Sequence, residues 1–414
     1  MRCGGWVVLT HAVGQPVMRV LCTCLPGFGH FLPMLPLARA LTAAGHDVAF
    51  ASAADFCPQM EREGFVTFPA GISLADQLAE AAKRYPEQHA MPHGLERFYT
   101  FVPRMLAGVA APPRAADLMP VVDEWRPDVV VHDEADFGAP VAAAAHDVPY
   151  ADHGMGVFRP LHMARLAAEV AAPLWQRFGV DLGPYGGLFR HLYLDVCPPS
   201  LQSAEIGQVK TARPMQSAHI VMGDQRLPDW MPALRPVPTI YVTLGTIFNQ
   251  NPRVFTTVLE SLRDQDCNVI VTVGPENDPA VLGPQPDHVH VERFIPQEAL
   301  LPHCDLVINQ GGTAILSILA QGLPLLVLPQ GANQFFHAQA CLRAGVARVL
   351  NPGEITIDAV RRDVDALLTH AEYTAAARRT AAEIDAMPGP DGGVRLLEVL
   401  VAEGRAAAGE AVTS

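Results

Sequence analysis

The fold is decided by residues 18–53, MRVLCTCLPGFGHFLPMLPLARALTAAGHDVAFASA. The short apolar run that opens this stretch ends in Pro-Gly and is typical of a buried strand. From Leu32 to Ala44 apolar residues recur at helical spacing, and the pattern stops at Gly45. The run VAFASA, residues 48–53, then predicts a second strand. Strand, turn, helix and strand make a βαβ unit, which predicts a parallel sheet with its ligand site at the carboxyl ends of the strands.

The rest of the N-terminal half continues this alternation. A helix ending near Trp125, a strand at Asp128–His132 and a helix at Ala139–His146 make this half doubly wound. Two looser segments, 70–125 and 152–195, interrupt it. They either line an apolar pocket or cover the sheet, and the sequence favours neither. Their aromatic residues are Phe98, Tyr99, Phe101, Phe158, Trp175, Phe178, Tyr185 and Phe189.

A second α/β half begins after a proline-rich segment. Residues 227–238, LPDWMPALRPVP, contain four prolines and predict a linker. The fold class is therefore α/β, with two Rossmann-like doubly wound parallel-sheet domains at 18–226 and 239–385 and a C-terminal helix with a frayed tail at 386–414. In the second domain we expect strands at TIYVTLGT, Asn268–Gly274, His288–Glu292, Leu306–Asn309 and Leu325–Leu328, and helices at Arg253–Arg263, Thr313–Gln321 and from Phe335 and Thr356.

The composition narrows the class of function. The chain has 414 residues, of which 50% are hydrophobic, so it folds around cores and is not disordered. Its formal net charge of −14 has the wrong sign for binding a nucleic acid or an anionic membrane. The uncharged stretch 306–342 is interrupted by glycine and proline too often for a membrane span. A small anionic ligand remains open, because backbone N–H groups hold phosphate without net positive charge.

The cysteines and the N-terminus bear on the cellular setting. Eight cysteines are scattered without a CxxC pair or metal-ligand spacing, which favours a reducing cytoplasm and predicts no metal site. The first 17 residues lack the layout of a signal peptide, and a strong strand follows at once. We therefore expect Met18 to be the natural start.

Two side chains at strand ends are candidates for acid-base chemistry. His30 follows the first strand at the mouth of the expected crevice, where a neutral imidazole can serve as a general base. Asp133 ends another strand of the same sheet, and a carboxylate there can fix the tautomer of an imidazole. Two alternatives stay open: a structural role for His30 in its turn, and a helix N-cap role for Asp133, Glu134 or Asp136.

Two glycine turns lie at strand ends in the second half. The strand YVTLGT ends in Gly245 and Thr246, and DLVINQGGTA continues into Gly311, Gly312 and Thr313 before a helix. Backbone N–H groups, a helix N-terminus and threonine hydroxyls suit a diphosphate, without the lysine of a P-loop. Each turn alone is common, so neither by itself identifies an anion site.

In combination these motifs resemble the nucleotide-sugar-dependent glycosyltransferases of the GT-B fold, in particular the actinobacterial enzymes that decorate macrolides and polyketides. In the N-terminal half the resemblance rests on GHFLPMLPLARALTAAGHDVAFA, residues 29–51. In the C-terminal half it rests on YVTLGTIFN (241–249), RFIPQEALLPHCDLVINQGG (293–312) and GLPLLVLPQGANQFFHAQACLRAGVA (322–347). It covers the chain from Met18 to about residue 400.

The resemblance implies an inverting hexosyltransferase whose two domains face each other across a cleft. In such an enzyme His30 removes the acceptor proton, Asp133 orients His30, and the donor is a TDP- or UDP-sugar, with no metal and no further cofactor. A hydrophobic polyketide- or macrolide-like acceptor would bind in the N-terminal domain and the nucleotide sugar in the C-terminal domain, with a homodimer left open. The donor residues implied are Gly245, Thr246, Phe294, Ile295, Gln297, Gln310, Gly311, Gly312, Thr313, Gln330, Asn333 and Gln334.

The sequence departs from the family pattern at the second glycine turn, residues 310–315, which we call the phosphate turn because the family contacts phosphate there. The family has a histidine before the two glycines and Gly-Thr or Gly-Ser after them, whereas this chain has Gln310 before them and Thr313, Ala314 and Ile315 after them. A neutral amide binds phosphate less strongly than an imidazolium, by about 1–2 kcal/mol. Asn333 also stands where an acidic residue is frequent in the family.

These departures keep two rival interpretations open. One is a non-catalytic helper protein with a weakened donor site, although a helper has no need of both His30 and Asp133. The other is a nucleotide-sugar epimerase of the same fold, which has no need of the long aromatic insertions.

Overall fold

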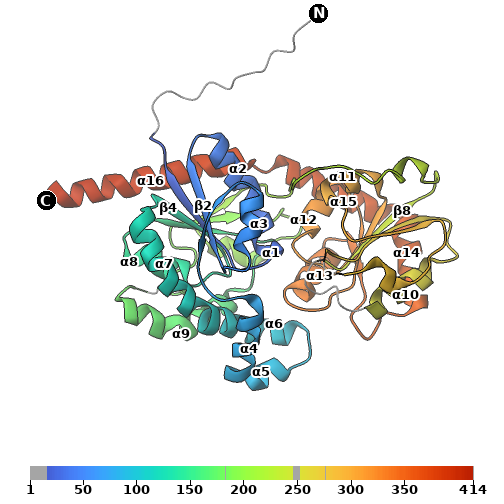
Figure 1. Ribbon diagram of the computed structural model, residues 1–414, viewed down its shortest axis with the longest axis horizontal. Coiled ribbons are helices and arrows are strands. Elements are labelled where there is room, and N and C mark those ends of the chain that lie inside the picture. The colour runs from blue at the N-terminus through green and yellow to red at the C-terminus, as the bar shows by residue number, and fades with distance from the viewer. Residues whose placement is uncertain (1–15, 182, 246–251, 276, 414) are drawn as a thin grey trace, which may run out of the picture.

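The computed structural model describes residues 16–181, 183–245, 252–275 and 277–413. The chain forms two α/β lobes, coloured mainly blue to green and yellow to orange in Figure 1. Each lobe is built on its own parallel sheet, with helices packed on it. The predicted α/β class with two Rossmann-like sheets is therefore confirmed.

The N-terminal lobe has a seven-stranded sheet in the order β3-β2-β1-β4-β5-β6-β7. Its strands are β1 (Arg19–Thr23), β2 (Asp47–Ser52), β3 (Val66–Pro69), β4 (Val129–Asp133), β5 (Tyr150–His153), β6 (Leu192–Asp195) and β7 (Ala212–Pro214). β1 pairs in parallel with β2 on one side and with β4 on the other, so the strand order reverses between β1 and β4. Open α/β sheets bind ligands at such a switch point, beyond the carboxyl ends of the strands.

The C-terminal lobe has a six-stranded sheet in the order β10-β9-β8-β11-β12-β13. Its strands are β8 (Thr239–Thr243), β9 (Asn268–Thr272), β10 (Val289–Glu292), β11 (Leu306–Asn309), β12 (Leu325–Val327) and β13 (Ala347–Val349). β8 and β11 form the switch point of this sheet. Both strands are buried along their whole length, which explains why they read as continuous apolar runs in the sequence.

Helices pack on both sheets, and α4 to α6 project from the N-terminal lobe (Figure 1). The helices of the N-terminal lobe are α1 (Phe28–Phe31), α2 (Leu35–Ala43), α3 (Cys57–Arg62), α4 (Leu74–Arg84), α5 (Pro86–Ala90), α6 (Leu95–Met105), α7 (Ala111–Trp125), α8 (Ala139–Ala145) and α9 (Leu161–Phe178), with a π-helical segment at Leu106–Ala110 between α6 and α7. Those that follow are α10 (Pro252–Leu262), α11 (Gln297–Leu300), α12 (Ile315–Ala320), α13 (Gln334–Arg343), α14 (Ile357–Thr369), α15 (Ala371–Ala386) and α16 (Pro390–Thr413).

The structure corrects the start of the first predicted helix. The first helix begins at Phe28, not Leu32, and a 3-10 turn at Leu32–Met34 separates it from α2, because Pro33 and Pro36 cannot donate to the helical hydrogen-bond ladder. The last helix, α16, runs from Pro390 to Thr413 through a stretch rich in alanine, the best helix former, and fraying of the tail stays a prediction.

The C-terminal helix returns to the N-terminal lobe and packs along α2 (Figure 1). The contact is close at Gly393, where an added Cβ would lie 2.9 Å from Leu37 Cδ1 and would overlap Met215 Sδ. Nε2 of His46 lies 3.3 Å from Oε1 of Glu398 further along the helix. The last helix of the chain is therefore part of the packing of the first lobe.

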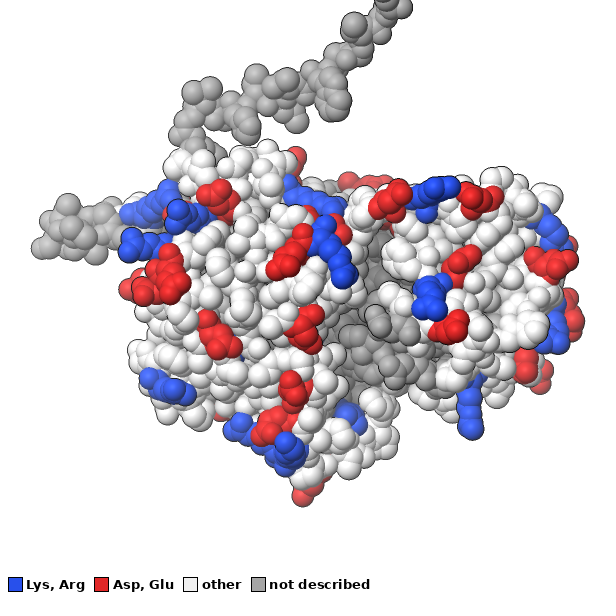
Figure 2. Space-filling model, in the orientation of Figure 1, with Lys and Arg blue, Asp and Glu red and all other residues white. Residues whose placement is uncertain are grey.

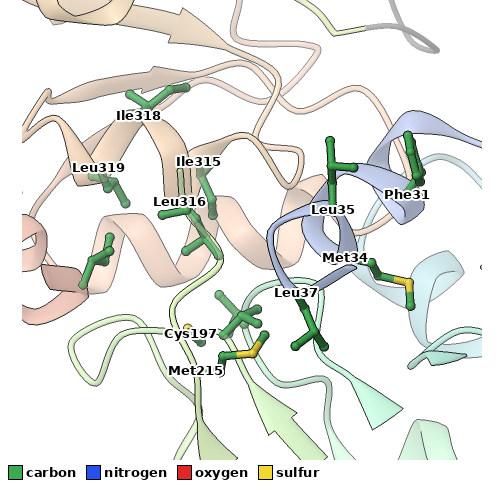
Figure 3. Packing of buried hydrophobic residues seen from close by; sticks show 14 of the residues in the cluster. Phe31, Met34, Leu35, Leu37, Cys197, Met215, Ile315, Leu316, Ile318 and Leu319 are labelled. Carbon is green, nitrogen blue, oxygen red and sulfur yellow. The ribbon is translucent and has the colours of Figure 1, made fainter. Parts of the chain in front are cut away.

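One hydrophobic cluster continues from lobe to lobe. Figure 3 shows Leu37 of α2 near Met215 in the N-terminal lobe, with Ile315 and Leu316 of α12 in the same cluster. All of these side chains are buried. Because apolar groups from both lobes leave water together, this contact stabilises their arrangement.

Charged side chains of both signs are scattered over the face shown in Figure 2, without a continuous basic surface on that face. No described helix is both long and apolar enough to cross a membrane.

Candidate active site

His30 and Asp133 meet at the switch point of the N-terminal sheet. His30 lies in α1, shortly after β1, and Asp133 is the last residue of β4. Nδ1 of His30 is 3.2 Å from Oδ2 of Asp133. The His30 side chain is 25% exposed, whereas the Asp133 side chain is fully buried. In this pair the carboxylate is therefore shielded from solvent, whereas a ligand can reach the imidazole.

The environment of Asp133 keeps its carboxyl group ionised. Burial alone would raise its pKa, but His30 and the backbone N–H groups of Leu25 and Ala135 outweigh burial and hold the pKa at about 2. These N–H groups donate to Oδ2 at 2.8 Å and to Oδ1 at 2.6 Å. An ionised carboxylate only accepts hydrogen bonds, so Nδ1 of His30 carries the hydrogen. Nε2 is then the basic nitrogen of the pair.

Asp136 performs the capping role that the sequence left open. Its Oδ1 accepts hydrogen bonds from the N–H groups of Gly138 and Ala139, both at 3.0 Å. Its Oδ2 pairs with Arg114, which is fully buried. Arg114 also donates to backbone carbonyls at the ends of β1, β2 and β3. Since Asp136 satisfies the start of α8, Asp133 is left to His30.

A cleft between the lobes joins the two switch points. It encloses about 1480 Å³ of space, part of it open to solvent, and we call it the interlobe cleft. The N-terminal lobe contributes Phe28, Gly29, His30, Leu32 and Met155, and the segment before the second sheet contributes Ile220, Met222 and Gln225. The predicted donor residues in its wall are Gly245, Phe294, Ile295, Gln297, Gln310, Gly312, Thr313, Asn333 and Gln334.

The two predicted glycine turns come together in this cleft. Gly245 and Gly311 have φ angles of +73° and +82°, a region that suits glycine. A Cβ on Gly245 would overlap Nε2 of Gln310, and one on Gly311 would lie 2.8 Å from Val327 Cγ1. Only glycine fits both positions, so the backbone of these turns and the Gln310 amide can approach one ligand. Gly311 itself is buried behind the wall.

Gln330 and Gln334 make hydrogen bonds within their own loop, and one further predicted residue cannot be compared with the prediction. Thr246 lies outside the described residues. Gln330 is not in the wall of the interlobe cleft, because its amide donates to Leu328 O of its own loop at 2.9 Å. Oε1 of Gln334 accepts hydrogen bonds from the N–H groups of Gln330 and Gly331, at 2.7 and 2.9 Å. The side-chain oxygen of Gln334 therefore holds the loop 328–333 in shape.

His337, which the sequence analysis does not single out, connects the phosphate turn to Asn333. Its Nδ1 is 3.0 Å from Gly311 O and its Nε2 is 3.4 Å from Asn333 Nδ2. Burial lowers the pKa of His337 to about 4, so the ring is neutral and Nδ1–H donates to Gly311 O. The signal in the sequence was the spacing of Asn333 and His337, four residues apart on one helical face.

A second cavity lies in the N-terminal lobe and meets the interlobe cleft at His30, Met155, Ala332 and Asn333. We call it the N-terminal pocket, and it encloses about 1100 Å³ of space, part of it open to solvent. Its wall is mainly apolar and comes largely from α4, α6 and the loops at the switch point. The lining residues are Leu25, Pro26, His30, Leu74, Gln77, Leu78, His93, Gly94, Arg97, Phe98, Phe101, Val102, Met105, Leu106, Ala135, Met155, Arg159, Ala332 and Asn333.

The two aromatic insertions have different roles. From the first, Phe98 and Phe101 line the N-terminal pocket. In the second, Phe158 and Phe189 pack on Tyr193, with ring centroids 5.5 and 5.3 Å from it, and line neither the N-terminal pocket nor the interlobe cleft. The pocket alternative therefore holds for the first segment, and the cover alternative holds for these rings of the second.

Among the described residues, no three His, Cys, Asp or Glu side chains are grouped so as to hold a metal ion. The site thus consists of a carboxylate-oriented histidine where an apolar pocket meets a glycine-lined cleft. Two Rossmann-like sheets that turn their switch points toward one such cleft define the GT-B class of glycosyltransferases.

Comparison with known proteins identifies the family. The family models described as erythromycin biosynthesis protein CIII-like, N-terminal and C-terminal domain, match residues 39–245 and 256–400. The chain belongs to this family of GT-B antibiotic glycosyltransferases.

Individual relatives match over almost their whole length. The chain is 31% identical over 407 residues to the L-demethylnoviosyl transferase of Streptomyces niveus, covering 96% of this chain and 100% of that protein. It is 30% identical over 440 residues to the TDP-daunosamine transferase DnrS of Streptomyces peucetius, covering 95% and 100%. The solved structure of the glycosyltransferase SnogD from Streptomyces nogalater superposes with a TM-score of 0.74 at 27% identity, covering 93% and 100%.

Proposed function

We propose that this glycosyltransferase moves a hexose from a TDP-sugar to a hydroxyl group of a hydrophobic natural-product acceptor, with inversion at the anomeric carbon. The observation that carries the proposal is the position of His30, which lies in the wall of both cavities. An acceptor in the N-terminal pocket and a donor in the interlobe cleft would meet at its imidazole. TDP is favoured over UDP by the relative named as a TDP-daunosamine transferase.

The proposed step needs only groups that the chain supplies. Nε2 of His30 takes the proton of the acceptor hydroxyl while its oxygen attacks the anomeric carbon. The bond from that carbon to the diphosphate breaks on the opposite face, so the configuration inverts and TDP leaves with the electron pair. Asp133, 3.2 Å from Nδ1, stabilises the imidazolium that forms. The backbone N–H groups near Gly245 and Gly312 and the Gln310 amide would stabilise the departing charge.

The test is the turnover of His30→Ala, measured as TDP release from a panel of TDP-hexoses with 4-methylumbelliferone as a phenolic acceptor. We expect a loss of about 10²–10⁴ in kcat, the range typical of a missing general base. Asp133→Asn is expected to lower kcat as well, because an amide does not hold Nδ1 in the protonated tautomer.

A matched control is His303→Ala, which removes an exposed histidine outside both cavities. It should keep wild-type turnover. Near-normal turnover of His30→Ala with an intact thermal unfolding curve would rule out the base role.

A further inference from the structure

The N-terminal pocket has basic side chains in its wall but no carboxylate among its described lining residues. Besides His30 and Asn333, its polar residues are Gln77, His93, Arg97 and Arg159. This is notable in a chain of net charge −14. A cavity of one sign attracts a ligand group of the opposite sign.

Arg159 is not the free charge of this pocket, because the protein already balances it. Its Nε lies 3.2 Å from Oε1 of Glu134, and its Nη2 donates to the carbonyl of the same residue. The other carboxylate oxygen of Glu134 accepts from the Tyr193 hydroxyl at 2.9 Å. Arg159 is therefore committed to a buried carboxylate.

Arg97 has no carboxylate partner among the described residues. Its Nη1 donates to the carbonyls of His89 and Met91, at 2.5 and 3.0 Å, and its guanidinium carbon lies 4.8 Å from the centre of the Phe101 ring. Within the described part of the chain, Nε and Nη2 make no hydrogen bond. The titratable neighbours of Arg97, His89 and His93, are basic too. The pKa of His93 is lowered, mainly by burial and to a smaller extent by the positive charge of Arg97.

These contacts fix the guanidinium before a ligand binds. Two carbonyls hold Nη1, and the aromatic ring supports the plane of the group. The edge formed by Nε and Nη2 has two N–H groups in the fork geometry that matches both oxygens of a carboxylate. Phe98, in the same helix, adds a second aromatic wall to the pocket.

We propose that the acceptor is an acidic aromatic molecule whose carboxylate binds Arg97 while the hydroxyl group to be glycosylated lies at His30. The proposal rests on the proposed function, because it assigns a chemical feature to the acceptor of that reaction. It makes Arg97 a specificity-determining residue of the acceptor pocket.

The test compares two fluorescent probes that differ by one charge, 7-hydroxycoumarin-3-carboxylic acid and its ethyl ester. Both are titrated into the full-length protein at pH 7, without donor, and the dissociation constants are read from fluorescence. We expect the wild type to bind the acid at least about tenfold more tightly than the ester, because only the acid can accept charge-assisted hydrogen bonds from Arg97 with its carboxylate. The preference should shrink as ionic strength rises.

Three variants separate recognition from a merely structural role. Arg97→Met keeps the apolar stem and should lose the preference for the acid while binding the ester within about threefold of the wild type. Arg97→Lys keeps the charge and should retain part of the preference. Arg104→Met removes a charge from the same helix, where Arg104 bonds to Thr100 O at 2.7 Å outside the pocket, and should bind both probes as the wild type does.

An acid that binds no better than its ester, including no measurable binding of either, overturns the proposal. An equal loss of affinity for both probes in Arg97→Met also overturns it, since Arg97 would then have a structural role in holding α5 and α6 together. Neither readout uses turnover. If the protein shows no preference for the acid but still binds TDP and transfers sugar to the ester, the proposed function stands and this inference fails. If it prefers the acid through Arg97 but neither binds TDP nor transfers sugar, the acid-binding pocket stands and the proposed function fails.

Discussion

At the scale of single residues, one hydrogen bond decides which nitrogen of His30 is basic. The carboxylate that receives it is fully buried and still ionised, because two backbone N–H groups and the imidazole together outweigh the cost of burial. The base is therefore positioned by β4 and by the turn after β1, and a change in either element would alter it without touching the imidazole.

Gln310 is the residue at which donor affinity is expected to respond to a single substitution. Its amide lies against Gly245 and Gly312 in the wall of the interlobe cleft. Gln310→His is expected to strengthen TDP binding by about tenfold, because a charged donor to phosphate exceeds a neutral one by roughly 1–2 kcal/mol. Isothermal titration calorimetry measures this, with Gln321→His, outside the cleft, as the control. Unchanged or weaker binding would show that Gln310 does not contact the diphosphate.

His337 predicts a pH dependence of stability. Its pKa is lowered from 6.5 to about 4, so below pH 6.5 the unfolded chain takes up a proton that the folded chain refuses. The free energy of unfolding should therefore fall as pH falls from 6.5 to 4, by up to about 3 kcal/mol from this group, and level off below 4. His337→Gln should remove this part of the slope in urea unfolding at a series of pH values. The exposed His303→Gln should follow the wild-type slope, and a His337→Gln curve parallel to the wild type would contradict the prediction.

At the scale of elements, the sequence was sufficient to predict a strand where that strand is buried and mainly apolar. β1, β4, β8, β9 and β11 are runs of buried apolar residues, and all of them are found where the sequence analysis expects strands. The strands β3, β5, β6, β7 and β13 were not predicted, and each of these short strands contains a polar or charged residue. The segment YADH, for example, has two polar residues at its end and no apolar alternation, so its pairing with β4 and β6 makes it a strand.

The candidate site divides in the same way. His30, Asp133 and the glycine turns lie at or shortly after the carboxyl ends of strands, so the rule for parallel sheets predicts that they lie together. Arg97 and Arg159 lie in the two insertions, whose path over the sheet depends on tertiary packing that no local pattern encodes. The resemblance to the family assigns Gln330 to the donor site, but its amide donates to a carbonyl of its own loop.

The contact between α16 and α2 predicts a large effect from one small residue. Gly393→Val should destabilise the protein by about 1–3 kcal/mol, because the new side chain meets Leu37 and Met215, which are buried and cannot move away freely. Thermal unfolding measures the loss. Gly404→Ala in the same helix, where an added Cβ comes no closer than 3.6 Å to Pro149, should be neutral or stabilising by up to about 1 kcal/mol. Equal effects at both positions would show that helix propensity alone is responsible.

At the scale of the whole molecule, ligand binding should be visible in global unfolding. TDP at a hundred times its dissociation constant should stabilise the protein by about 2.7 kcal/mol, which is several degrees in Tm. The effect of UDP should be smaller at equal concentration, since uracil lacks a methyl group whose burial contributes about 0.8 kcal/mol. Ile220, Met222 and Phe294 provide apolar surface for it in the interlobe cleft. No shift with either nucleotide would contradict the donor assignment, and an equal shift with both would contradict the preference.

The path of α16 also limits how this chain can be recombined with its relatives. Its lobes are not simply consecutive in the sequence, because α16 is fastened to the N-terminal lobe through Gly393 and an ion pair between Arg405 and Asp128. A chimera that exchanges the donor-side lobe at one junction in 227–238 would pair α2 with a foreign last helix. Exchange of that lobe alone requires a second junction between α15 and α16, so that the final helix is inherited with the lobe it covers.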